Sequence, residues 1–219
     1  MALCDAYFLT AKYKIKSILL QKFEMEKLSA ELKKAIEALT PTEKDKLLFR
    51  LISLKPDLIK KLTYELLEDR ETLDTRTAKV QKGIDSCLKF EDYWFTPGNL
   101  LMQMRSANAL ITEHVKVTKD KMGEVFLTMH LLTEAFRLWS KEANNYPESR
   151  WVTFQEYVIK RTAMTMDKAQ KLDPMFQPDI TILMNELLFQ VFAFQHTKRA
   201  AEAANLDESY VFLEKMKKK

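Results

Sequence analysis

The sequence predicts an all-α protein, either stacked antiparallel helical hairpins (a tetratricopeptide-like α-solenoid) or an irregular helical bundle. Only three of its 219 residues are glycine, whereas average usage would give about fifteen. Hairpin turns and phosphate-binding loops depend on glycine where φ is positive or backbones approach closely. A hydrophobic content of 47% is sufficient for a core. These observations favour helices joined by short turns.

Prolines and capping residues divide the first half of the chain into helices. Thr40 precedes Pro41 and Glu43, a typical helix start. Pro56 suits the first turn of the next helix. We therefore expect helices over residues 5–39 (with a break near Ser29), 40–54, 57–69 and 72–88. The segment 90–99 holds four aromatic residues and the Pro97-Gly98 pair, and we expect it to be non-helical.

The second half shows longer helical patterns. We expect helices over residues 99–117, 121–143, 150–172 and 179–204, and a short one over 210–215. Residues 121–143 and 180–194 are apolar around most of the helix circumference, which is typical of central helices. The run His130-Leu131-Leu132 holds no helix breaker, so the local chemistry predicts a continuous helix there.

We expect three segments: an N-terminal extension over residues 1–24, amphipathic helices over 25–96, and a helical array over 97–219 continuous with them. Met25 opens an ordinary amphipathic pattern and is an alternative start to Met1. Two cysteines are too few for a disulfide framework, and no run of eighteen apolar residues is uninterrupted. The first lysines follow the apolar residues, the reverse of a signal peptide. These features predict a cytoplasmic protein without a membrane partner.

The charges argue against nucleic-acid binding. The net charge is +4, with 35 basic and 31 acidic residues spread along the chain. Nucleic-acid binding needs a basic face. Apart from the tail at 215–219, the sequence offers a short row of Arg76, Lys79 and Lys82, which is typical of the exposed side of a helix.

The sequence lacks a catalytic motif, and we expect no cofactor. His114, His130 and His196 do not form an HExxH or Glu-x-x-His pattern. His130 and Glu134 lie one helical turn apart, so an ion pair or a metal site is an alternative to an exposed stripe. Glu186 and Gln190 are also one turn apart, on an apolar helix, where a carboxylate needs a partner or a groove. The aromatic residues Tyr93, Trp94 and Phe95 suggest a binding loop, or a loop that covers the core.

A weak repeat appears at a separation of 66 residues. Phe126, His130 and Ala135 match Phe192, His196 and Ala201. The pattern over residues 118–205 resembles the tetratricopeptide repeat family, because six residues fall at that family's spacings: Met122, Gly123, Phe126, Ala135, Trp139 and Pro147. In that family Gly123 would be the small residue that permits close helix packing.

The resemblance implies a groove lined by the first helix of each hairpin. It places six residues there: Asp120, Glu124, Leu127, Glu186, Gln190 and Ala193. The set is acidic or neutral, so a basic or apolar helical segment suits it better than a carboxylate tail. We expect a non-enzymatic adaptor or scaffold that binds a protein or peptide. The alternatives are a metal-dependent helical-bundle enzyme with His and carboxylate ligands, and a helical nucleic-acid-associated module.

Overall fold

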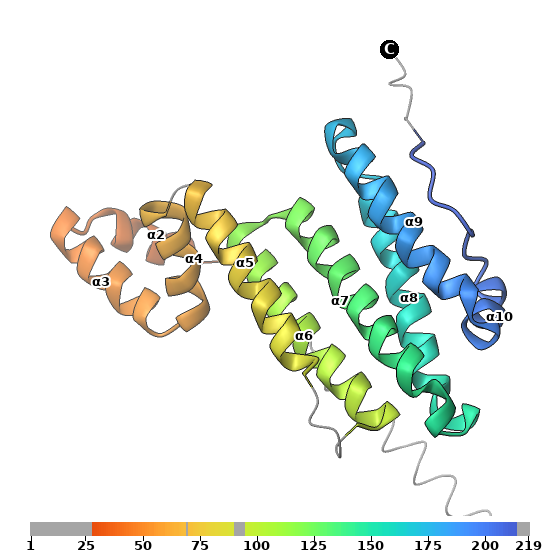
Figure 1. Cartoon of the computed structure of the whole chain (residues 1–219). Helices are drawn as coiled ribbons and strands as arrows, with labels where there is room; N and C mark the ends of the chain where they lie inside the picture. The colour runs from red at the N-terminus through yellow and green to blue at the C-terminus, as the bar shows by residue number, and fades with distance from the viewer. Residues whose placement is uncertain (1–27, 69, 90–94, 214–219) are drawn as a thin grey trace, which may run out of the picture. The chain divides into compact units, whose positions relative to one another are not determined.

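The computed structural model describes residues 28–68, 70–89 and 95–213, and every regular element among them is a helix (Figure 1). This agrees with the all-α prediction. The chain forms two compact units, residues 1–55 and 56–219. The division at Lys55 places two of the helices predicted within residues 25–96 in the second unit. Among the described residues, no helix is both long enough and apolar enough to cross a membrane.

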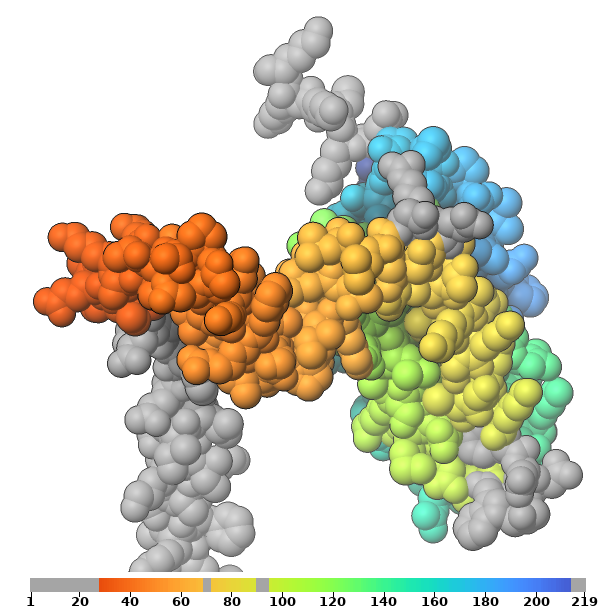
Figure 2. Space-filling model, turned by 90° about the vertical axis from the view of Figure 1, so that its left-hand side faces the viewer, coloured from red at the N-terminus to blue at the C-terminus, as the bar shows by residue number. Residues whose placement is uncertain are grey.

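The first unit contains α2 (Ala30–Glu37) and α3 (Pro41–Ser53), drawn in red and orange in Figure 2. Ser29 caps α2, in agreement with the predicted break. Thr40 and Glu43 form a capping box: Glu43 N–H donates to Thr40 Oγ1, and Thr40 N–H donates to Glu43 Oε2. Neither helix has a fully buried residue, and Phe49 is 66% exposed.

The second unit holds seven α-helices among its described residues. They are α4 (Pro56–Leu67), α5 (Arg70–Cys87), α6 (Pro97–Thr118), α7 (Lys121–Glu142), α8 (Val152–Ala169), α9 (Gln177–Ala193) and α10 (Gln195–Ala203). Helix α7 packs against α5, α6, α8 and α9, which makes it the central helix (Figure 1). It is continuous through residues 130–132, as the local chemistry predicts. Its two long apolar faces are therefore buried on both sides.

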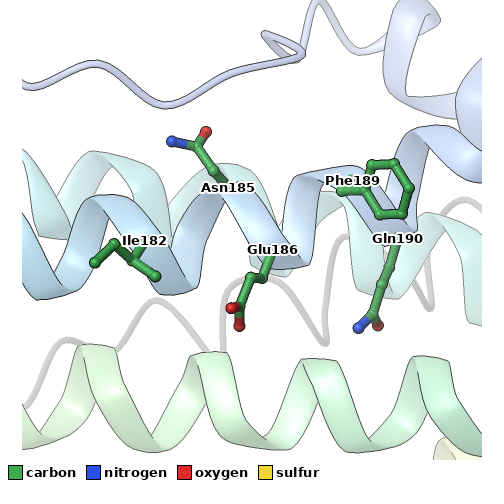
Figure 3. A pocket seen from close by; sticks show the side chains of 5 residues that line it. All are labelled: Ile182, Asn185, Glu186, Phe189 and Gln190. Atoms are coloured by element: carbon green, nitrogen blue, oxygen red, sulfur yellow. The ribbon is translucent and has the colours of Figure 1, made fainter.

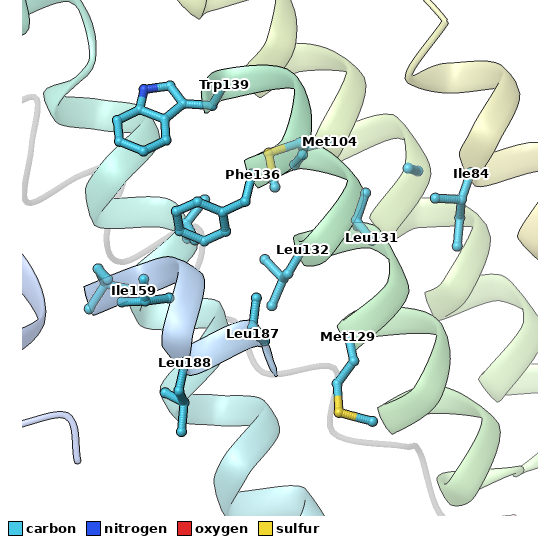
Figure 4. Close-up of a cluster of buried hydrophobic side chains, with 14 of the residues drawn as sticks. Ile84, Met104, Met129, Leu131, Leu132, Phe136, Trp139, Ile159, Leu187 and Leu188 are labelled. Atoms are coloured by element: carbon cyan, nitrogen blue, oxygen red, sulfur yellow. The ribbon is translucent and has the colours of Figure 1, made fainter. Parts of the chain in front are cut away.

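Aromatic side chains from α7 and the start of α8 form a cluster within the core, and Figure 4 shows Phe136 and Trp139 of this cluster. Trp139 stacks on Phe154 with ring centroids 6.1 Å apart and meets Trp151 edge to face at the same distance. Phe136 meets Trp139 at 5.8 Å. Each such ring pair stabilises the fold by about 0.5–1.5 kcal/mol, in addition to the effect of burying its apolar surface. Trp151 begins the turn into α8, so this cluster fixes the hairpin between α7 and α8.

Three sequence predictions for the C-terminal part are wrong. The helix predicted over 179–204 is two helices, because Phe194 is extended (φ −107°, ψ 129°) between α9 and α10. Residues 210–213 of the predicted short helix are also non-helical. The third error concerns α9, which is not central: Ile182 is 60% exposed and Phe189 75% exposed. No glycine or proline marks the break at Phe194, and hydrophobicity alone did not reveal the exposed side.

Candidate partner-binding site

Helix α9 has a buried side and an outward side. Its inward residues are completely buried: Ile180, Met184, Leu187, Leu188 and Val191. The outward side carries a shallow pocket of about 490 Å³, lined by five residues: Ile182, Asn185, Glu186, Phe189 and Gln190 (Figure 3). Their spacing of i, i+3, i+4, i+7 and i+8 places them on one helix face.

Two oxygen acceptors of this pocket have no partner among the described residues. Glu186 is exposed, and its carboxylate makes no hydrogen bond or ion pair there. Gln190 Oε1 is buried and accepts no hydrogen bond. Both side chains project to the same side of α9 (Figure 3). A buried acceptor without a donor is unfavourable by about 1–3 kcal/mol. The exposed carboxylate of Glu186 is the acceptor that a ligand with N–H groups can reach.

The other predicted groove residues, on and before α7, have partners within the fold. Asp120 caps α7, since Gly123 N–H donates to its Oδ1 at 2.8 Å. Glu124 forms an ion pair with Lys168 of α8. Leu127 is 2% exposed and belongs to the core. The structure thus leaves Glu186 and Gln190 free and engages the α7 residues internally.

The aromatic segment contributes to the core through Phe95. Phe95 is buried, its ring lies 6.3 Å from that of Trp151, and its carbonyl accepts a hydrogen bond from the Tyr146 hydroxyl. Tyr93 and Trp94 lie outside the described residues, as do the N-terminal extension, Met25 and the basic tail. Of the two interpretations of this segment, a binding loop or a loop that covers the core, Phe95 fits the second.

Each histidine lies beside a different carboxylate. His114 Nε2 is 3.8 Å from Asp120 Oδ2, His130 Nε2 is 2.7 Å from Asp85 Oδ1, and His196 Nδ1 is 2.6 Å from Glu148 Oε1. The ion pair between His130 and Glu134, which the sequence left open as an alternative to an exposed stripe, is not formed, because Glu134 pairs with Arg137 instead. Within the described ranges, no three His, Cys, Asp or Glu side chains come together as a metal site.

Arg76 and Lys79 of the basic row on α5 line a second pocket, of about 320 Å³, between α4, α5 and α6. Arg76 binds the Glu68 carboxylate with two nitrogens, and its guanidinium lies 5.6 Å from the Tyr64 ring. Lys60, across the same pocket, pairs with Glu113. These two ion pairs neutralise part of the basic charge around this pocket.

Sequence reasoning found Glu186 and Gln190 but missed Ile182, Asn185 and Phe189. A signal was present: the polar residues Asn185, Glu186 and Gln190 interrupt the apolar pattern of this helix, and Ile182 and Phe189 lie near them at helical spacing. Comparison of the chain with family models, curated proteins and solved structures gives no match to any of them. The function therefore has to be argued from this geometry.

Proposed function

We propose that this chain is a non-enzymatic binding module that holds an amphipathic helical segment of a partner protein on the outward face of α9. The observation that carries this proposal is the exposure of Phe189, at 75%, next to two acceptors without donors. Exposed aromatic residues are enriched at the centres of protein interfaces. A preformed helical surface of this kind suits a helix that lies in a groove.

The Glu186 carboxylate defines the chemistry of the partner segment. Covering Phe189 and Ile182 with an apolar surface would also remove water from the Glu186 carboxylate, and an unpaired buried charge is strongly unfavourable. A lysine or arginine of the partner would pair with the exposed Glu186 carboxylate in a charge-assisted hydrogen bond. The partner segment therefore has a basic residue flanked by apolar ones at helical spacing.

The proposal includes an architecture and a location. The helical hairpins would form a tetratricopeptide-like array, and the protein would act as an adaptor in the cytoplasm. The presence of only two cysteines in the sequence supports a reducing compartment. Cys87 is free and half-buried.

A photo-crosslinking amino acid at position 189 tests this proposal. Replacing Phe189 by p-benzoylphenylalanine should give a covalent adduct with a partner in cells of the source organism. The matched control carries the same amino acid at Met164 of α8, which is 41% exposed. An adduct specific to position 189, whose crosslinked peptide contains Lys or Arg between apolar residues, supports the proposal. Equal adducts at both positions, or none at 189, contradict it.

A further inference from the structure

The chain after α10 runs extended beside α9 (Figure 1). Helix α10 ends in a Schellman motif: Asn205 has a positive φ of 52°, Leu206 N–H donates to Ala201 O at 2.9 Å, and Asn205 N–H donates to Glu202 O at 3.0 Å. This turn sends residues 206–213, which we name the strap, back along the molecule. The strap lies against α9 and the C-terminal end of α8, and we name the surface beneath it the α8–α9 groove.

Two side-chain amides hold the strap by its main chain. Asn185 Oδ1 accepts from Tyr210 N–H at 2.7 Å, and Asn185 Nδ2 donates to Tyr210 O at 3.3 Å. Gln170 Nε2 donates to Val211 O at 2.6 Å, and Leu213 N–H donates to Gln170 Oε1 at 3.1 Å. Figure 3 shows Asn185 pointing away from Glu186 and towards the strap. These four bonds are independent of the strap's side chains.

One strap side chain is fully inserted. Tyr210 is 2% exposed, and its hydroxyl donates to Gln177 Oε1 at 2.9 Å. Gln177 is oriented for this role, because its Nε2 donates to Ala169 O at 2.9 Å. In contrast, Val211 is 63% exposed and Leu213 71% exposed. The strap is therefore anchored by the tyrosine at position 210, whereas the side chains of Val211 and Leu213 contribute little to its burial.

We propose that the α8–α9 groove is a binding site for an extended, tyrosine-containing segment of a partner protein, and that the strap is its intramolecular competitor. Main-chain hydrogen bonds give affinity, and a single pocket gives specificity, which is the usual division in the recognition of extended peptides. A tethered competitor has a high effective concentration. A partner must therefore displace the strap, and the groove is closed until it does.

This inference is separate from the proposed function. The outward face of α9 uses Glu186, Gln190 and Phe189. The α8–α9 groove uses Gln170, Gln177 and Asn185, whose side chain points away from Glu186. Glu186→Lys should leave the α8–α9 groove unchanged, so the failure of one proposal is distinguishable from the failure of the other.

The test uses a fluorescent peptide with the sequence of residues 205–213 and the full-length chain. Tyr210→Ala removes the anchor of the strap and leaves the groove intact. Fluorescence anisotropy should show the peptide binding this variant at least ten-fold more tightly than the wild-type chain. Adding Asn185→Ala to Tyr210→Ala should abolish peptide binding, because two of the main-chain hydrogen bonds are lost. A phosphotyrosine in the peptide should also abolish binding, because the site that buries the tyrosine hydroxyl has no space for a phosphate. Circular dichroism checks that the variants fold.

A second measurement needs no variant. In the wild-type chain, a large excess of the peptide should displace the strap and accelerate hydrogen exchange at the amides of Tyr210 and Leu213, which donate to Asn185 and Gln170. Unchanged exchange at these amides with excess peptide overturns the proposal. Equal peptide affinity for the wild-type and Tyr210→Ala chains overturns it too.

Discussion

Asp120 Oδ2 lies 3.8 Å from His114 Nε2, so one carboxylate connects the last turn of α6 to the first turn of α7. The same carboxylate caps α7 at Gly123. A Cβ on Gly123 would lie 2.1 Å from Asp120 Oδ2. The expectation that Gly123 permits close packing between helices is therefore wrong, since its missing side chain makes room for the cap. The turn between α6 and α7 depends on this local arrangement.

Asp120→Ala should lower the free energy of unfolding at pH 7 by about 1 kcal/mol, the usual effect of removing an N-cap. The nearby His114, which has the largest effect, and the Gly123 N–H hold the pKa of Asp120 below its usual value. The stabilisation is therefore present above about pH 4, the pKa of an unfolded Asp, and is lost as the pH falls through the lower folded pKa.

Urea denaturation from pH 7 to pH 2 checks this prediction. The difference between wild type and Asp120→Ala should shrink at the acid end. Asp74→Ala, on an exposed position of α5, is the matched control and should have little effect. A difference that is independent of pH would contradict the role assigned to the carboxylate.

Gly83→Val should destabilise the second unit by about 1–3 kcal/mol, the range for overpacking. A Cβ at Gly83 would lie 2.9 Å from Leu110 Cδ1, at the contact between α5 and α6. Gly98→Val is the control, because nothing lies within 4 Å of a Cβ there. Thermal unfolding of the two variants measures the difference. Equal losses would show that α5 and α6 do not approach closely at Gly83.

His130 and Asp85 should show a coupling of about 0.2–1 kcal/mol in a double-mutant cycle, as partly exposed ion pairs do. Their atoms are 2.7 Å apart, and the pair joins α7 to α5. Single and double alanine variants, compared by urea denaturation, give the value. The cycle for His130 and Glu134 should give no coupling, since Glu134 pairs with Arg137. Coupling in the second cycle alone would support the ion pair between His130 and Glu134, the alternative that the sequence left open.

Thr197→Val should lower the free energy of unfolding by about 1–3 kcal/mol, because a buried carbonyl then loses its donor. Thr197 Oγ1 donates to Val191 O at 2.6 Å and lies 3.1 Å from Phe194 O, where α9 gives way to α10. Thr153→Val, on the exposed side of α8, is the control and should be nearly neutral. Chemical denaturation compares the two, and equal stability of both variants would contradict the account.

The helix starts could be predicted from sequence because their signals are local. Thr40, Pro41 and Glu43 lie within four residues and specify the start of α3 by themselves. The continuity of α7 through residues 130–132 likewise follows from the lack of a breaker. Local chemistry is sufficient where the interacting residues are neighbours in the chain.

The remaining features depend on residues that are distant in sequence. Phe194 leaves the helix to meet Trp139, with ring centroids 4.6 Å apart, and no local signal specifies that contact. Tyr210 is held by Asn185, which lies 25 residues earlier in the chain. Which side of α9 is exposed depends on how the other helices pack against it. The sequence could therefore supply Glu186 and Gln190 as candidates, but not the residues that surround them in the fold.

The central claim, that α9 holds a partner through Glu186, is tested most directly by charge reversal. The tagged wild-type chain, Glu186→Lys and Glu156→Lys are used for affinity capture from the native cell, with quantitative mass spectrometry. Glu156 is an exposed residue of α8 and provides the same change of charge elsewhere. The account predicts a partner whose recovery falls at least ten-fold with Glu186→Lys and is unchanged with Glu156→Lys. Identical recovery with both variants would contradict it.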